Sequence, residues 1–178
     1  MTTQPIIESD MTFGPYPDGY CFRVEKSNCY AAIKDHVQMA EFLLLQVSNG
    51  KSVIWIVEAK SSTPHPKTQP NFDDFIAEIR EKLVNAFSLG WAAILRRHPQ
   101  AASELPDEFK KLDLSQADAK FVLVINGHKD AWLPPLHDAL LKALRSTIKT
   151  WGLSPVSVAV INDSLATTYG LIDSAQET

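Results

Sequence analysis

The segment from Met39 to Ser62 constrains the fold most strongly, because two apolar runs flank Asn49-Gly50 within it. Asn-Gly tolerates positive φ at both central positions of a two-residue turn, which makes it the strongest short-range hairpin signal. A turn of this kind pairs Ser48 with Lys51. The sequence therefore predicts a β-hairpin over about residues 37–60.

The same register gathers charged side chains at one end of the hairpin. Glu41 falls directly opposite Glu58, and opposed residues share a face with Cβ atoms about 4.5–5.5 Å apart. Lys60 lies on that face too, because side chains alternate along a strand. The rest of the hairpin is apolar on both faces, which is typical of strands covered on both sides. Opposed like charges are destabilising there, and a bound divalent cation would explain them.

The remaining chain predicts an α/β domain. Residues 1–19 are polar and rich in proline and glycine, so we expect an N-terminal arm that ends in turns, followed by one domain over residues 20–178. Periodicity and capping signals favour a central mixed sheet flanked by helices. The expected elements besides the hairpin are strands at 20–24, 121–125 and 156–161 and helices at 28–34, 71–97, 106–112, 134–151 and 163–169.

Composition narrows the function classes. The 178 residues are 45% hydrophobic and 21% charged, as in an ordinary globular protein. The net charge of −4 gives no overall basic field for nucleic acid, although a local basic cleft is compatible with it. Two cysteines make no disulfide framework or metal motif, so we expect a reducing, cytoplasmic setting. We find no signal peptide and no apolar run of membrane-spanning length, and we expect no membrane partner.

The tripeptide Glu58-Ala59-Lys60 stands on the second hairpin strand, with an acidic residue on the strand before it and an amphipathic helix after it. This arrangement resembles the PD-(D/E)XK nuclease superfamily, which includes restriction endonucleases, resolvases and many bacterial defence proteins. The resemblance implies a restriction-endonuclease-like core. It also implies metal-dependent hydrolysis of phosphodiester bonds in nucleic acid, DNA in preference to RNA, in a restriction or defence setting.

The resemblance also implies roles for individual residues. Glu41 and Glu58 would bind Mg²⁺ or Mn²⁺, and Lys60 would be the catalytic amine that positions or activates the attacking water. Carboxylate oxygens are the ligands that magnesium prefers, and a lysine can stabilise charge that develops on a phosphate. The chain departs from the family pattern at its first carboxylate, which is Glu rather than Asp and follows Ala40 rather than Pro. Accessory candidates are Glu25, Ser61, Ser62 and Lys82.

Two other interpretations stay open. An E-x-K tripeptide is expected by chance about as often as not in a chain of this length, and Lys60 with either glutamate could form a solvated ion pair of little energetic worth. The chain could also be an inactive nuclease-fold subunit that binds or scaffolds within a larger complex, or it could act as a homodimer. The five histidines are scattered, and no glycine-rich phosphate loop occurs.

Overall fold

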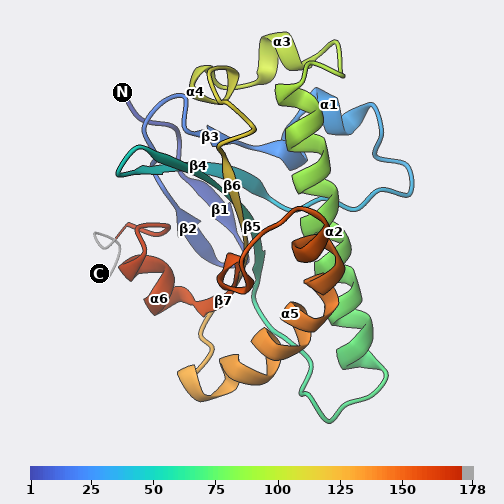
Figure 1. Ribbon diagram of the computed structural model, residues 1–178. Coiled ribbons are helices and arrows are strands. Elements are labelled where there is room, and N and C mark those ends of the chain that lie inside the picture. The colour runs from blue at the N-terminus through green and yellow to red at the C-terminus, as the bar shows by residue number, and fades with distance from the viewer. Residues whose placement is uncertain (174–178) are drawn as a thin grey trace.

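A computed structural model describes residues 1–173. Its centre is a five-stranded mixed sheet in the order β3-β4-β5-β6-β7 (Figure 1). The first three strands are antiparallel, and β6 and β7 run parallel to β5. This confirms an α/β fold with a mixed sheet. The strands are β3 (Cys21–Phe22), β4 (Phe42–Ser48), β5 (Lys51–Lys60), β6 (Asp118–Ile125) and β7 (Val158–Asn162).

The predicted hairpin is present in the predicted register. Ser48 pairs with Lys51, and Phe42 pairs with Val57. Asn49 and Gly50 both have positive φ, at 51° and 74°, as a two-residue turn that matches the strand twist requires. The Glu41 amide, one residue before β4, donates over 3.0 Å to the carbonyl of Val57, which also pairs with Phe42. Regular pairing therefore ends at Phe42 and Val57, and Glu41 lies beside the end of the ladder, near enough to Glu58 for the two charges to interact.

Two helices cover one face of the sheet, α2 (Asn71–Ile94) and α5 (Leu133–Thr150) (Figure 1). Each presents an apolar stripe to the sheet, and their side chains share one core with the alternate hairpin residues of that face. The hairpin members of this core are Leu43, Leu45, Ile54 and Ile56. Glu58 follows the same alternation and therefore points toward α2.

The opposite face of the sheet is not covered by the layer of helices that the sequence predicted. It is covered by a second, N-terminal hairpin of β1 (Ile6–Glu8) and β2 (Met11–Phe13), together with α6 (Asp163–Thr168). The sequence predicted turns but no strands in residues 1–19. Three-residue strands are too short for a period-two pattern to stand out from polar neighbours. Yet Ile6, Met11, Phe13 and Tyr16 are buried against the sheet.

Several short elements complete the described chain. The 3₁₀ turn η1 (Val24–Lys26) replaces the end of the expected strand at 20–24, and α1 (Asn28–Ala31) is shorter than the helix expected at 28–34. Ser27 caps α1, since its hydroxyl accepts from the Tyr30 amide. The others are α3 (Ala101–Glu104), which was not predicted, α4 (Asp107–Lys110), η2 (Asp130–Trp132) and η3 (Pro155–Ser157). No helix within residues 1–173 has the length and apolar character needed to cross a membrane.

Candidate metal and catalytic site

Glu58 is a fully buried carboxylate near the carboxyl end of β5. Its Oε1 lies 2.8 Å from Lys82 Nζ and 3.5 Å from Lys60 Nζ. Its Oε2 is also buried and has no hydrogen-bond partner among the residues that the structure describes. Burial raises the pKa of Glu58, and the two lysines oppose that rise. A buried carboxylate oxygen without a partner is costly unless some further group binds it.

The two lysines reach Glu58 from different elements. Lys82 comes from the buried side of α2, and Lys60 ends β5. Lys60 also donates to Glu78, one turn before Lys82 on α2, over 2.9 Å. Burial acts to lower the pKa of Lys82, but the charge and hydrogen bond of Glu58, together with the charges of Glu41 and Glu78, outweigh it and the pKa is raised. Lys82, an accessory candidate from the sequence, is therefore an ammonium group in direct contact with Glu58.

Glu41 shares this site but lacks such a partner. No ion pair joins it to a lysine or arginine within residues 1–173. Its pKa is raised to about 8, first by burial and then by the negative charges of Glu58, Glu25 and Glu8. Glu41 and Glu58 are thus close enough, as predicted, for their negative charges to repel each other. Near neutral pH the carboxyl group of Glu41 holds a proton for much of the time.

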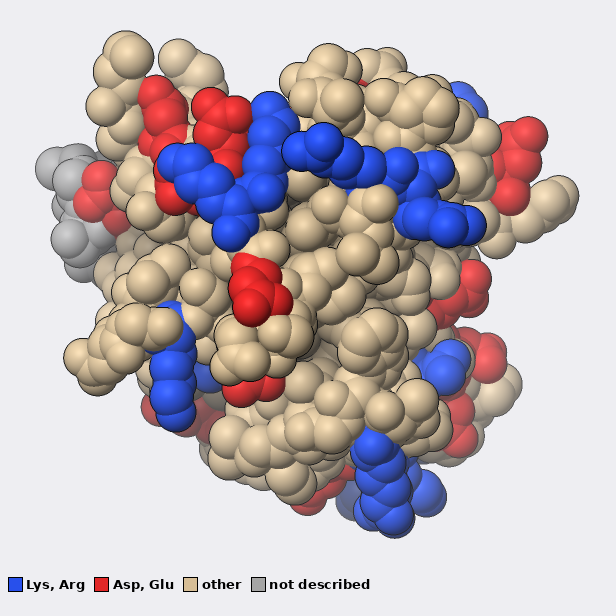
Figure 2. Space-filling view, turned by 45° about the horizontal axis from the view of Figure 1, so that its top comes forward, with Lys and Arg blue, Asp and Glu red and all other residues tan. Residues whose placement is uncertain are grey.

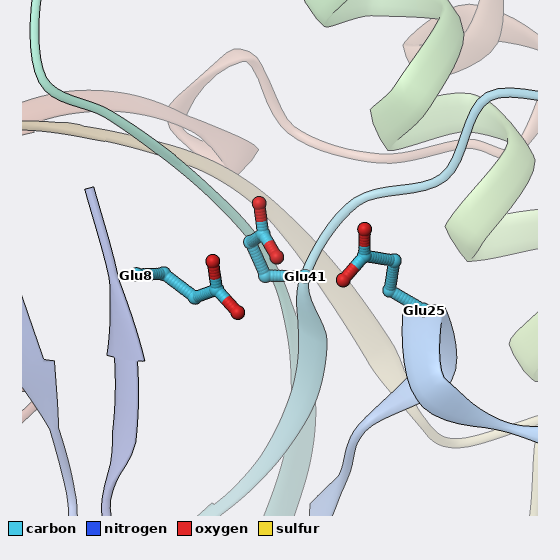
Figure 3. Close-up of side chains that lie close together, drawn as sticks. All are labelled: Glu8, Glu25 and Glu41. Carbon is cyan, nitrogen blue, oxygen red and sulfur yellow. The ribbon is translucent and has the colours of Figure 1, made fainter.

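A third and a fourth carboxylate approach Glu41 from elements distant in sequence. One oxygen each from Glu8, Glu25 and Glu41 lie within 4.8 Å of one another, and the three side chains converge in Figure 3. Glu25 comes from η1 and was an accessory candidate, whereas Glu8 ends β1 and was missed. No local motif marks Glu8, because only the packing of the N-terminal hairpin brings it to the site.

Two surface cations border this carboxylate group. Arg23 lies 3.6 Å from Glu8, and Lys26 lies 2.9 Å from Glu25. The remaining accessory candidates, Ser61 and Ser62, follow β5 in an exposed bend. Their hydroxyls make no hydrogen bond within the described part of the chain, so the structure does not draw them into the cluster.

The donor set suits a hard divalent cation. Mg²⁺ and Mn²⁺ take carboxylate oxygens and usually retain several waters. Glu58 Oε2 is buried and has no hydrogen-bond partner among the described residues, and the half-buried Glu41 supplies further carboxylate oxygens in its cluster with Glu8 and Glu25. An ion there would replace the repulsion between the two carboxylates by attraction.

Comparisons with known proteins found no similar protein. No protein-family model, no curated protein and no solved structure matches the chain.

Proposed function

We propose that the protein is a metal-dependent phosphodiesterase that acts on nucleic acid, DNA in preference to RNA, with a PD-(D/E)XK-like site on a restriction-endonuclease-like core. The observation that carries this proposal is the pair formed by Glu58, whose buried Oε2 has no partner among the described residues, and the repelled carboxyl of Glu41. The element order, an antiparallel three-strand unit and a helix that leads to a parallel strand, supports the core assignment. A restriction or defence role extends the same resemblance.

Each residue has a definable task in this proposal. Glu41 and Glu58 would hold Mg²⁺ or Mn²⁺, and Glu25 and Glu8 would supply further oxygens at the open side. The ion would supply a Lewis acid for the phosphoryl oxygen and a bound water of lowered pKa. Lys60 carries a donor that can turn from Glu78, a partly exposed carboxylate, toward a phosphate or the attacking water. Lys82 opposes the rise that burial causes in the pKa of Glu58, and it orients the carboxylate.

Charge distribution bears on the nucleic-acid partner. Figure 2 shows Lys and Arg side chains gathered in a row across one face, although the protein is acidic overall. This view brings forward the end of the molecule that carries α3 and α4, whereas β5 leads toward the opposite end, so the row is separate from the carboxylate site. The site itself is nearly balanced, with five carboxylates against four cations. These groups are Glu8, Glu25, Glu41, Glu58 and Glu78, and Arg23, Lys26, Lys60 and Lys82.

One observation favours the second candidate, an inactive nuclease-fold subunit of a larger complex. Lys82 compensates the charge of Glu58 without a metal, and Lys60 is engaged by Glu78. A site of this kind can be a structural ion-pair network that holds α2 on β5. The two candidates differ in one measurable property, which is whether metal binds the folded protein through Glu58.

Thermal melts with and without Mn²⁺ test the proposal. Metal that binds only the folded state adds about 2.7 kcal/mol of stability at a hundredfold excess over its Kd, and we expect a rise of about 5–10 °C in the Tm of the wild type. Glu58→Gln should abolish that rise. Glu78→Gln is the matched control, because this neighbouring carboxylate contacts Lys60 but holds no metal in the proposal, and it should keep the rise.

Lys60→Ala separates binding from chemistry. This variant should retain the Mn²⁺-induced rise in Tm and lose cleavage of plasmid and single-stranded DNA. Equal melting temperatures with and without millimolar Mn²⁺, in the wild type and Glu58→Gln alike, would refute the metal site and leave the ion-pair network as the function of these residues.

A further inference from the structure

A cavity of about 270 Å³ opens between two loops. None of its lining residues has a role in the proposed chemistry. One loop follows β5 and the other follows β6, and these strands are parallel neighbours. Loops that follow the carboxyl ends of strands in α/β folds are frequent carriers of binding residues. The cavity therefore occupies a position suited to binding, at the same end of β5 as Glu58 and Lys60.

Hydrogen bonds join the two loops to each other and to β5, the strand that carries Glu58 and Lys60. The Asn126 amide donates to the Lys60 carbonyl over 2.9 Å. Thr63 Oγ1 and His128 Nε2, one from each loop, form a hydrogen bond of 2.9 Å. The Asn162 side chain, at the end of β7, donates to the His128 carbonyl and to Asp130. The walls are thus held by the ends of three adjacent strands, which is the preorganisation that a binding site needs.

The lining is flat, apolar and aromatic. Three prolines, two histidines and Trp132 surround the cavity, and Trp132 is 51% exposed. The His128 and Trp132 rings stand edge to face, with centroids 5.3 Å apart. Burial lowers the pKa of His128, so the neutral ring faces the cavity. An exposed indole beside a neutral imidazole is a stacking surface for a planar ring.

Polar groups at the rim indicate which planar ring fits. Lys129 Nζ lies 5.2 Å from the centre of the Trp132 ring, which leaves a cation at the edge of the cavity. His65 Nδ1 accepts from the Lys67 amide, so a neutral His65 carries its proton on Nε2 and can donate. A ring with hydrogen-bonding edges, joined to an anionic group, matches this surface.

We propose that the cavity lined by Thr63, His65, His128 and Trp132 binds one unpaired nucleobase of a single-stranded nucleic acid, with its phosphate toward Lys129. The choice of nucleic acid rests on the proposed function, and the cavity narrows the substrate class to strands with an unpaired nucleotide. A base in a duplex must first leave its stack and its pair to enter such a pocket.

Binding to a fluorescein-labelled 12-nucleotide oligothymidylate, followed by anisotropy in EDTA, tests the proposal without any cleavage. Trp132→Ala should weaken binding about fivefold or more, because base–aromatic stacking is worth that much. Trp132→Phe should recover most of the loss. Trp151→Ala is the matched control, since Trp151 is also 51% exposed but lies at the end of α5 away from the cavity, and its affinity should equal that of the wild type.

A second variant guards against a fold defect in Trp132→Ala. Ala131 is an exposed residue in the lining, and Ala131→Leu should also weaken binding by filling the cavity. A blunt 12-base-pair duplex should bind the wild type and Trp132→Ala equally. Failure of the wild type to bind the oligonucleotide, or equal affinity of the wild type, Trp132→Ala and Ala131→Leu, would overturn the proposal.

The experiment separates this inference from the proposed function. If Trp132→Ala loses oligonucleotide binding and Mn²⁺ does not raise the Tm of the wild type, the base pocket is supported and the nuclease proposal is rejected. Metal-dependent cleavage with unchanged binding in Trp132→Ala would leave the nuclease standing without the pocket.

Discussion

At the scale of single residues, two neighbouring carboxylates have partners of opposite charge: lysines surround Glu58, and other carboxylates surround Glu41. Glu58 is the more deeply buried, yet Lys82 and Lys60 compensate its charge. Glu41 is only half-buried and faces Glu58, Glu25 and Glu8 without an ion pair to any described cation. Glu41 therefore holds a proton for much of the time near neutral pH, and binding of a metal ion to its carboxylate must displace that proton.

A pH series of the metal-free protein tests this assignment. The pKa of Glu41 is near 8 in the folded protein and near 4.5 when unfolded. The folded state therefore binds the proton more tightly, and the free energy of unfolding falls as pH rises between these values. Glu41→Gln should match the wild type near pH 4 and exceed its stability by about 1–2 kcal/mol at pH 9, a value reduced by partial exposure. Urea unfolding in EDTA measures both, and equal stability at pH 9 would contradict the assignment.

At the scale of elements, the N-terminal hairpin has two roles. Its end carries Glu8 to the carboxylate cluster. Its inner side places the fully buried Phe13 against Phe42 of β4, with ring centroids 5.4 Å apart and the rings edge to face. The hairpin therefore closes one face of the central sheet and contributes a carboxylate to the candidate site.

Truncation of Phe13 tests the structural role of this hairpin. Phe13→Ala should lower the free energy of unfolding by about 3–5 kcal/mol, because it leaves a cavity between β2 and the sheet. Ile7→Ala, on the same hairpin but 73% exposed, should change it by less than about 0.5 kcal/mol. Urea unfolding compares the two variants, and similar losses would show that the hairpin does not pack as described.

At the scale of the whole molecule, residues near the two ends of the described chain meet over the same face of the sheet. The Leu171 carbonyl accepts from the Gly14 amide over 2.9 Å and from the Tyr16 hydroxyl over 2.8 Å. Phe13 and Gly14 also form β-bridges with Ile172. The segment after α6 thus fastens the N-terminal hairpin against the sheet.

Removal of one hydroxyl tests this closure. Tyr16→Phe should lower the free energy of unfolding by about 1 kcal/mol, the usual net worth of a buried hydrogen bond. Tyr169→Phe is the control, because that ring is half exposed and its hydroxyl makes no hydrogen bond within residues 1–173. A loss in Tyr169→Phe as large as that in Tyr16→Phe would argue against the closing role of Leu171.

The sequence alone determined the features that depend on neighbours along the chain. Asn49-Gly50 set the turn, and the turn set the register from Ser48–Lys51 to Phe42–Val57, which brings Glu41 and Glu58 to the same end of the hairpin. Helical periodicity set α2 and α5 to within a few residues. These predictions succeed because turn chemistry and side-chain periodicity act over a few residues.

Only the tertiary structure decided which groups from distant parts of the chain lie beside Glu41 and Glu58. Glu8 enters the site through the packing of a hairpin too short to predict, and Lys82 reaches Glu58 through the way α2 crosses β5. The cavity between Thr63 and His128 likewise exists only because β5 and β6 lie side by side. Such contacts depend on how elements pack in three dimensions, and no local pattern encodes the distance between atoms on different elements.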